Sequence, residues 1–246
     1  MIVVCAATRT EAAECRRGIS RAGVEGFEVL VTGVGPRRAG EALARHLDRV
    51  GRGRSRGAAP GRAARLVVSS GFAGALTPDL EPLSWITASA LHRLTEDGAV
   101  PVTIAPGVLR VVAGAIACQV VTAERAVNTP MSGVRAPAAL DMESAALAEV
   151  AAAAGVAFSV LRLVTDTPVR PLAMVGRSLA AMLSSDTLSA QAIHGVDAAV
   201  KAVRSPRATA SFLRETSRWR QQLRSGWRDR ARDVLAAAMA AGSRPC

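Results

Sequence analysis

Short apolar runs along the first two-thirds of the chain predict buried strands. They lie at residues 2–7, 27–32, 66–70, 82–90, 100–104, 108–113, 117–122 and 158–164. Segments with apolar residues at helical spacing occur at residues 8–20, 37–50 and 141–153. Strands that alternate with helices, together with a block of consecutive strands, predict an α/β fold. We expect a three-layer α/β/α sandwich with a mixed central sheet.

The last third of the chain has a different pattern. Beyond about residue 171 it predicts helix, and residues 207–241 form a long arginine-rich segment with apolar residues at helical spacing. We therefore expect a main domain at residues 1–200 and a basic helical C-terminal extension at residues 201–246. Trp219 and Trp227 are expected to pack this helix onto the body, with its arginines on an exposed face.

The composition is that of a globular protein with a sizeable core. The chain has 246 residues, half of them hydrophobic, and no apolar run reaches the roughly 18 residues of a membrane span. The N-terminal run resembles a first core strand more than a signal peptide, which predicts a cytoplasmic protein. The four cysteines lack CxxC spacing, so we expect small buried thiols and neither a disulfide framework nor a metal site.

The net charge of +11 raises the question of a polyanionic partner. Lys201 is the only lysine, and the arginines concentrate at residues 52–65 and 204–232. This bias is typical of a GC-rich coding sequence, and tyrosine is absent. We therefore expect no specific nucleic-acid partner. The arginine-rich tail suits peripheral contact with an anionic membrane.

Two carboxylates are candidates for chemistry. Glu143 lies near the start of an apolar helix, and Asp166 lies just past the end of a hydrophobic strand. In an open α/β sheet, strand ends and helix starts meet at one rim, where ligands bind. Polar or glycine-rich turns are also expected at residues 7–11, 33–35 and 71–74. One carboxylate could hold a ligand there while another moves a proton.

These turns in this order, with the Met142–Glu143 pair before the last, resemble the nucleoside phosphorylase/nucleosidase superfamily. It includes the methylthioadenosine/S-adenosylhomocysteine nucleosidases, the uridine and purine nucleoside phosphorylases, the futalosine hydrolases and the hopanoid-associated nucleosidases. The resemblance covers about residues 1–170. It implies cleavage of the N-glycosidic bond of a purine nucleoside, with neither a metal nor an organic cofactor. It also implies a homo-oligomer.

The resemblance assigns roles by position. Asp166 matches the catalytic aspartate that protonates or hydrogen-bonds N7 of the base, and Glu11 matches the acidic residue that activates water. Glu143, beside Met142, matches the residue that accepts from the ribose 2′ and 3′ hydroxyls. The remaining substrate-binding matches are in the segment beneath the sugar: Gly71, Phe72, Ala73 and Gly74.

Phe72 departs from the family pattern. Many members have Ser or Thr there, which helps to hold phosphate or the nucleophilic water, so the phenylalanine favours hydrolysis over phosphorolysis. An aromatic residue that stacks on the base is also missing near Ala126 and Val127. The residues around Met142 and the helical tail look most like the hopanoid-associated branch, whose substrate is an adenosylated triterpenoid.

Each site residue also has a simpler interpretation. Thr8 and Glu11 form the pattern of a capping box at a helix start. Glu143 could be a solvated residue favoured by the helix dipole, and Asp166 a turn residue two positions before Pro168. The sequence thus favours a hydrolase that releases adenine from a 5′-substituted adenosine, of the methylthioadenosine, S-adenosylhomocysteine or adenosylhopane type. The alternatives are a purine nucleoside phosphorylase and a weakly active nucleoside-binding or membrane-associated module.

Overall fold

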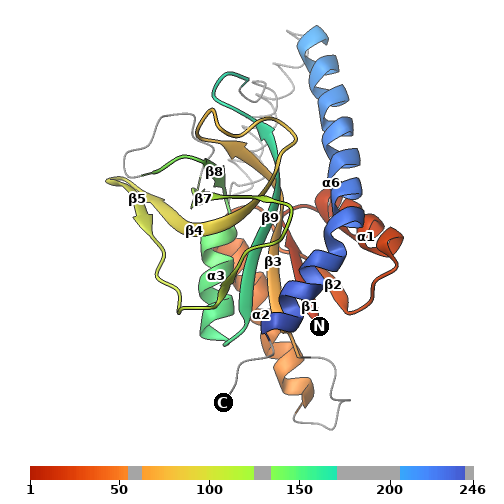
Figure 1. The fold of residues 1–246 in the computed structure, drawn as a ribbon, viewed down its shortest axis with the longest axis vertical. Helices are drawn as coiled ribbons and strands as arrows, with labels where there is room; N and C mark the ends of the chain where they lie inside the picture. The colour runs from red at the N-terminus through yellow and green to blue at the C-terminus, as the bar shows by residue number, and fades with distance from the viewer. Residues whose placement is uncertain (55–62, 125–133, 171–205, 242–246) are drawn as a thin grey trace, which may run out of the picture.

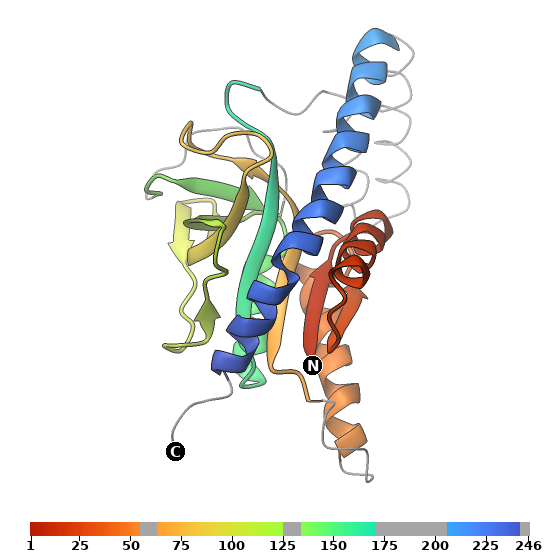
Figure 2. The same cartoon turned by 45° about the vertical axis from the view of Figure 1, so that its right-hand side comes forward.

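The computed structural model describes residues 1–54, 63–124, 134–170 and 206–241. They form a three-layer α/β/α sandwich (Figures 1 and 2). The strands are β1 (Ile2–Ala6), β2 (Phe27–Val31), β3 (Leu66–Ala75), β4 (Trp85–Thr95), β5 (Gly98–Pro101), β6 (Leu109–Arg110), β7 (Ile116–Thr122), β8 (Ala138–Asp141) and β9 (Ala157–Asp166). The helices are α1 (Arg9–Ala22), α2 (Pro36–Arg54), α3 (Ser144–Ala153) and α6 (Pro206–Ala241).

The central sheet is mixed. Its nine strands follow the order β2-β1-β3-β8-β7-β4-β9-β6, with β5 paired to β4. Strands β1, β2, β3 and β9 pair in parallel, whereas β8 is antiparallel to β3, and β4 is antiparallel to β9. Because β3 pairs with both β8 and β9, the strands β3, β8, β7, β4 and β9 close into a ring. The predicted fold class is confirmed.

Alternating residues of the sheet face two separate cores, as the period of two in a strand requires. Val3 of β1 and Val67 of β3 pack with α2 and α3. Their neighbours Val4 and Val68 pack with α1 and α6. In Figure 2, α6 crosses one face of the sheet next to α1, and its first turns extend beyond the body.

Helix α6 is built into the second core. Trp227 is fully buried and Trp219 nearly so, as the sequence predicts. The Trp227 ring meets Phe27 edge-on, with ring centroids 6.3 Å apart. Gly18 of α1 permits this close packing, because a Cβ there would overlap the backbone of α6 and the side chain of Trp227.

Several predicted boundaries are wrong. Residues 71–74 are not a turn, since β3 continues through them to Ala75, and Asp166 is the last residue of β9. Pairing between β3 and β9 holds both segments extended. Residues Ala138–Asp141 form strand β8, and the helix begins only at Ser144. Residues 108–113 contribute only the two-residue strand β6.

The helix predicted for residues 171–205 and the base-stacking position at Ala126 and Val127 lie outside the described residues. Cys5, Cys15 and Cys118 are buried free thiols. No helix within the described ranges has both the length and the apolar character needed to cross a bilayer.

Candidate functional site

Arg162, in the middle of β9, is the centre of a buried polar cluster. Only 2% of its side chain is exposed. Its Nη2 donates to Glu143 Oε2 at 2.9 Å and to Ser69 Oγ at 2.8 Å, and its Nη1 donates to the Phe72 carbonyl at 2.9 Å. Its Nε lies 2.9 Å from Asp141 Oδ2, an ion pair without hydrogen-bond alignment. One guanidinium thus joins β3, β8 and the start of α3.

Glu143 occupies the N-cap position of α3, but its side chain does not cap the helix. Its Oε1 instead accepts from the Gly35 amide at 3.0 Å, and its Oε2 accepts from Arg162. Gly35 has φ of +95°, a left-handed conformation that glycine adopts without strain. The solvated interpretation of Glu143 is wrong, because the residue is only 3% exposed. Burial raises the pKa of Glu143 to about 7, although Arg162 favours the charged form.

Glu11 does act as a capping residue, and it also reaches the sheet. The Thr8 hydroxyl and amide both donate to Glu11 Oε2, which completes the capping box at the start of α1. Its Oε1 accepts from the Phe72 amide at 3.1 Å. Gly71 allows this approach, since a Cβ there would collide with Oε1, and its φ of +135° also favours glycine. The capping and ligand interpretations of Glu11 are therefore compatible.

Asp166 lies at the other end of the same segment of β3. Gly74 is paired with it, and a Cβ on Gly74 would lie 3.0 Å from Asp166 Oδ2. The Thr165 hydroxyl donates to Asp166 Oδ1 at 2.8 Å. Burial raises the pKa of Asp166, and the Thr165 hydrogen bond opposes the shift only in part. A raised pKa keeps more of this carboxyl protonated near neutral pH.

A second layer of hydrogen bonds fixes Asp141 below Arg162. The Thr122 hydroxyl donates to Asp141 Oδ1 at 2.6 Å and accepts from the Ala145 amide at 2.9 Å. The Ser144 hydroxyl bridges Asp141 Oδ2 and Ser69. These contacts join the ends of β7 and β8 to the first turn of α3, and so hold Arg162 and Glu143 in position.

The structure brings most of the predicted site residues together. Glu11, Gly71 and Phe72 meet at one end of a β3 segment, Gly74 and Asp166 meet at the other, and Ala73 connects them, its carbonyl accepting from Thr165. Glu143 joins through Arg162, and Met142 is half-buried beside it. The Phe72 ring packs against Trp219, with centroids 6.2 Å apart.

Sequence reasoning missed Arg162 and its partner Asp141. A signal was present, because an arginine inside the apolar run at residues 158–164 is a charge in a buried strand, and such charges are rarely left unpaired. A groove of about 260 Å³ lies beside the cluster. Its lining includes Thr122, whose hydroxyl donates to Asp141, together with Pro36, Arg37, Arg93, Leu94, Glu124 and Ala146.

Comparisons with known proteins support the fold. No protein-family model and no curated protein sequence matches the chain. Solved structures do match. Helicobacter pylori 5′-methylthioadenosine/S-adenosylhomocysteine nucleosidase, in complex with a pyrrolopyrimidine compound, superposes with a TM-score of 0.55 at 13% identity, over 97% of each chain. A Borrelia burgdorferi protein assigned as the same type of nucleosidase and bound to adenine has a TM-score of 0.51 at 14% identity, over 79% of this chain and 98% of that one.

At such low identity, these similarities establish the fold alone. The chain shares its fold with these two structures, in agreement with the fold expected from the ordered motifs at residues 1–170.

Proposed function

We propose that this protein hydrolyses the N-glycosidic bond of a purine nucleoside, most simply a 5′-substituted adenosine. The observation that carries the proposal is the short segment of β3 between Gly71 and Gly74. Glu11 approaches one end of it, which requires glycine at position 71, and Asp166 approaches the other, where a Cβ on Gly74 would lie only 3.0 Å from Asp166 Oδ2. Three residues of extended chain span roughly 10 Å, which is enough to place a sugar and its base between the two carboxyls.

The two carboxyls are suited to opposite tasks. Asp166, whose pKa is raised by burial, would donate its proton to N7 of the departing base. The C–N bond breaks with its electron pair going to the base, and positive charge develops on the ribose. Water adds to C1′ and gives a proton to Glu11, so the products are the free sugar and the neutral base with its new proton on N7. Exchange with solvent removes the proton from Glu11 and returns one to Asp166. The carboxylates near the ribose favour the positive transition state electrostatically.

Glu143 would hold the ribose. Its Oε1 already accepts a hydrogen bond from the Gly35 amide, and its Oε2 accepts one from Arg162. An ionised carboxylate has about four lone-pair sites, so it can still accept from two ribose hydroxyls. Because Arg162 fixes the carboxylate, little conformational entropy is lost when the sugar binds.

Hydrolysis is favoured over phosphorolysis by the local charge. Asp141, Glu143 and Glu11 surround the single guanidinium of Arg162, and Asp141 and Glu143 pair with it. A phosphate dianion would approach this excess of negative charge unfavourably, whereas neutral water would not. Glu11 already occupies the Phe72 amide, which is one donor that a phosphate could otherwise use.

A bulky apolar 5′ group, as in an adenosylated triterpenoid, is the finer form of this proposal. Its support is the aromatic row of Phe72, Trp219 and Phe212 next to the site, with ring centroids about 6 Å apart. The motif resemblance to the hopanoid-associated branch points the same way. A homo-oligomer is expected from the same resemblance and can be tested by sedimentation.

The experiment follows base release chromatographically from methylthioadenosine, S-adenosylhomocysteine, inosine and an adenosine with a long apolar 5′ group, with and without phosphate. We expect adenine release that needs no phosphate and that falls at least about a hundredfold in Asp166→Asn. Asp79→Asn, an exposed aspartate outside the site, is the matched control. Strict dependence on phosphate would make the protein a phosphorylase.

A binding module gives a different pattern. It would bind nucleosides without releasing base, and Asp166→Asn would change affinity little. That outcome in a folded protein would overturn the enzymatic proposal.

A further inference from the structure

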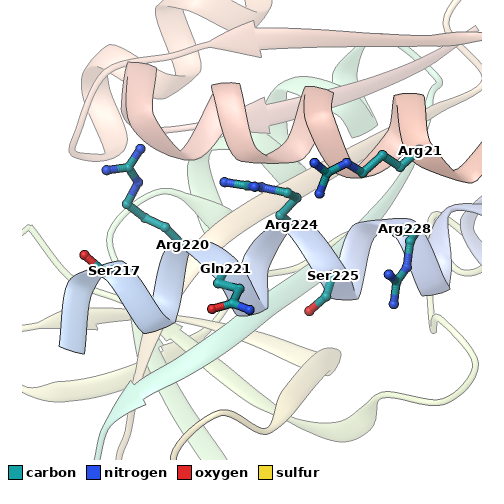
Figure 3. A pocket seen from close by; sticks show the side chains of 7 residues that line it. All are labelled: Arg21, Ser217, Arg220, Gln221, Arg224, Ser225 and Arg228. Atoms are coloured by element: carbon teal, nitrogen blue, oxygen red, sulfur yellow. The ribbon is translucent and has the colours of Figure 1, made fainter. Parts of the chain in front are cut away.

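A polar groove of about 430 Å³ lies between α1 and α6. Its lining consists of Arg21, Ser217, Arg220, Gln221, Arg224, Ser225 and Arg228. In Figure 3, Arg220 and Arg224 project from α6 toward α1, and Arg21 extends from α1 along the space between the helices. None of these residues belongs to the cluster around Arg162, so the groove is a separate feature of the molecule.

The groove has more positive than negative charge. Arg17, Arg220 and Arg224 all pair with one carboxylate, that of Glu14. Arg228 pairs with its neighbour Asp229, and Arg21 has no carboxylate partner among the described residues. Four guanidinium groups thus share two carboxylates, and the fifth, that of Arg21, has none. Like charges held this close repel one another, and an anion bound between them would remove the repulsion.

The arginines are also held in place before any ligand arrives. Glu14 is fully buried, and it accepts from Nε and Nη2 of Arg220 and from Nε of Arg224. A guanidinium has five N–H donors, so donors of both arginines remain for a ligand. This arrangement departs from the sequence expectation of a simple exposed arginine face, because Arg224 is only 28% exposed.

We propose that the groove between α1 and α6 binds a small polyphosphate anion, such as a di- or triphosphate group. Arg220, Arg224 and Arg228 are spaced four residues apart on one helix. Their Cα atoms therefore form a row with intervals of roughly 6 Å. Such a row matches a chain of linked phosphates better than a single phosphate, and guanidinium groups bind phosphate oxygens in pairs. The volume lies within the range of small-molecule sites.

A soluble anion fits the groove better than a membrane surface. Arg224 lies recessed between two helices, where a flat layer of lipid headgroups does not reach it. The residues that line the groove are all charged or polar, whereas helices that bind at a membrane interface insert apolar side chains.

The test is titration calorimetry of the full chain with sodium triphosphate and with pyrophosphate. The variant is Arg21→Gln/Arg228→Gln, since both residues are exposed and neither contacts Glu14. The control is Arg45→Gln/Arg49→Gln, which removes the same charge from exposed positions of α2 on the opposite face of the sheet. We expect one triphosphate per chain, affinity that falls with salt, at least a roughly tenfold loss in the variant and little change in the control.

Three results would overturn the proposal. The first is failure of both phosphates to bind. The second is equal weakening of triphosphate binding in the variant and the control, which would mean general attraction to a basic protein. The third comes from flotation with phosphatidylglycerol vesicles: binding to vesicles without binding to soluble triphosphate would make the groove part of a lipid-binding surface. Because this test does not measure base release, a negative result here would not contradict the proposed hydrolase activity.

Discussion

Glu11 makes contacts that belong to two different functions. Its Oε2 completes the capping box with Thr8, and its Oε1 accepts from the Phe72 amide beside Gly71. The substitution Glu11→Gln keeps a capping-box residue, so the free energy of unfolding should change by about 1 kcal/mol or less. It removes the base for water, so adenine release should fall at least about a hundredfold.

The matched variant for Glu11 is Thr8→Ala. It removes the N-cap and should lower the free energy of unfolding by about 1 kcal/mol, while base release stays within a few-fold. Urea unfolding and chromatography measure both properties on the same samples. If Glu11→Gln kept full turnover, Glu11 would be a capping residue only.

Arg162 forms ion pairs with the buried carboxylates of both Asp141 and Glu143. Arg162→Gln leaves both without their cation, which should cost about 3–5 kcal/mol of unfolding free energy at pH 8. Arg93→Gln breaks an ion pair with Glu149 in which both side chains are about half exposed, and should cost about 1 kcal/mol or less.

The cost of Arg162→Gln should shrink as the pH falls. Glu143 already has a pKa of about 7 in the folded protein, above its ordinary value of 4.5. The folded state therefore binds its proton more tightly than the unfolded state does. This group contributes its stability fully below pH 4.5, and the contribution is lost as pH rises through 7. Urea unfolding from pH 5 to 8 measures the trend, and a cost independent of pH would contradict it.

At the scale of elements, sequence patterns predicted most strands and helices because these depend on local periodicity. They failed where the pairing of distant strands determines the local conformation. Residues 71–74, rich in glycine, suggested a turn, but β9 pairs along them and holds them in β3. The candidate site was found in part for the same reason. Glu11, Glu143 and Asp166 belong to short motifs, whereas Arg162 gains its role from partners in distant strands, which no local pattern specifies.

Helix α6 and strand β4 meet at a glycine, which gives an element-scale prediction. Alanine in place of an interior helical glycine normally stabilises by about 1 kcal/mol. At Gly226 the added Cβ would overlap the Trp85 ring, so Gly226→Ala should instead lower stability by about 1–3 kcal/mol. Gly51→Ala, in open space on α2, should show the ordinary gain. Thermal unfolding compares the two, and a gain at both positions would mean that α6 does not approach β4 this closely.

At the scale of the whole molecule, the sequence divides the chain into a domain at residues 1–200 and a basic extension. The packing of α6 argues that the first part needs the second. Trp227, Leu223 and Val234 are fully buried, and their burial contributes roughly 8 kcal/mol at about 25 cal/mol per Å². That is comparable with the roughly 5–15 kcal/mol of a typical domain. The Trp227 indole also donates to Ser70 Oγ at 2.9 Å, next to Gly71 of the site.

A chain that ends at residue 205 should therefore lose cooperative unfolding, and with it base release, whereas removal of residues 242–246 alone should leave both intact. Circular dichroism during urea titration measures the first property, and adenine release the second. A truncated chain with a sharp transition near that of the full protein would show that α6 is an appendage. In that case Trp219 and Trp227 cover a core that is stable without them. The contact between the Trp219 and Phe72 rings would then contribute to ligand binding and not to the stability of the fold.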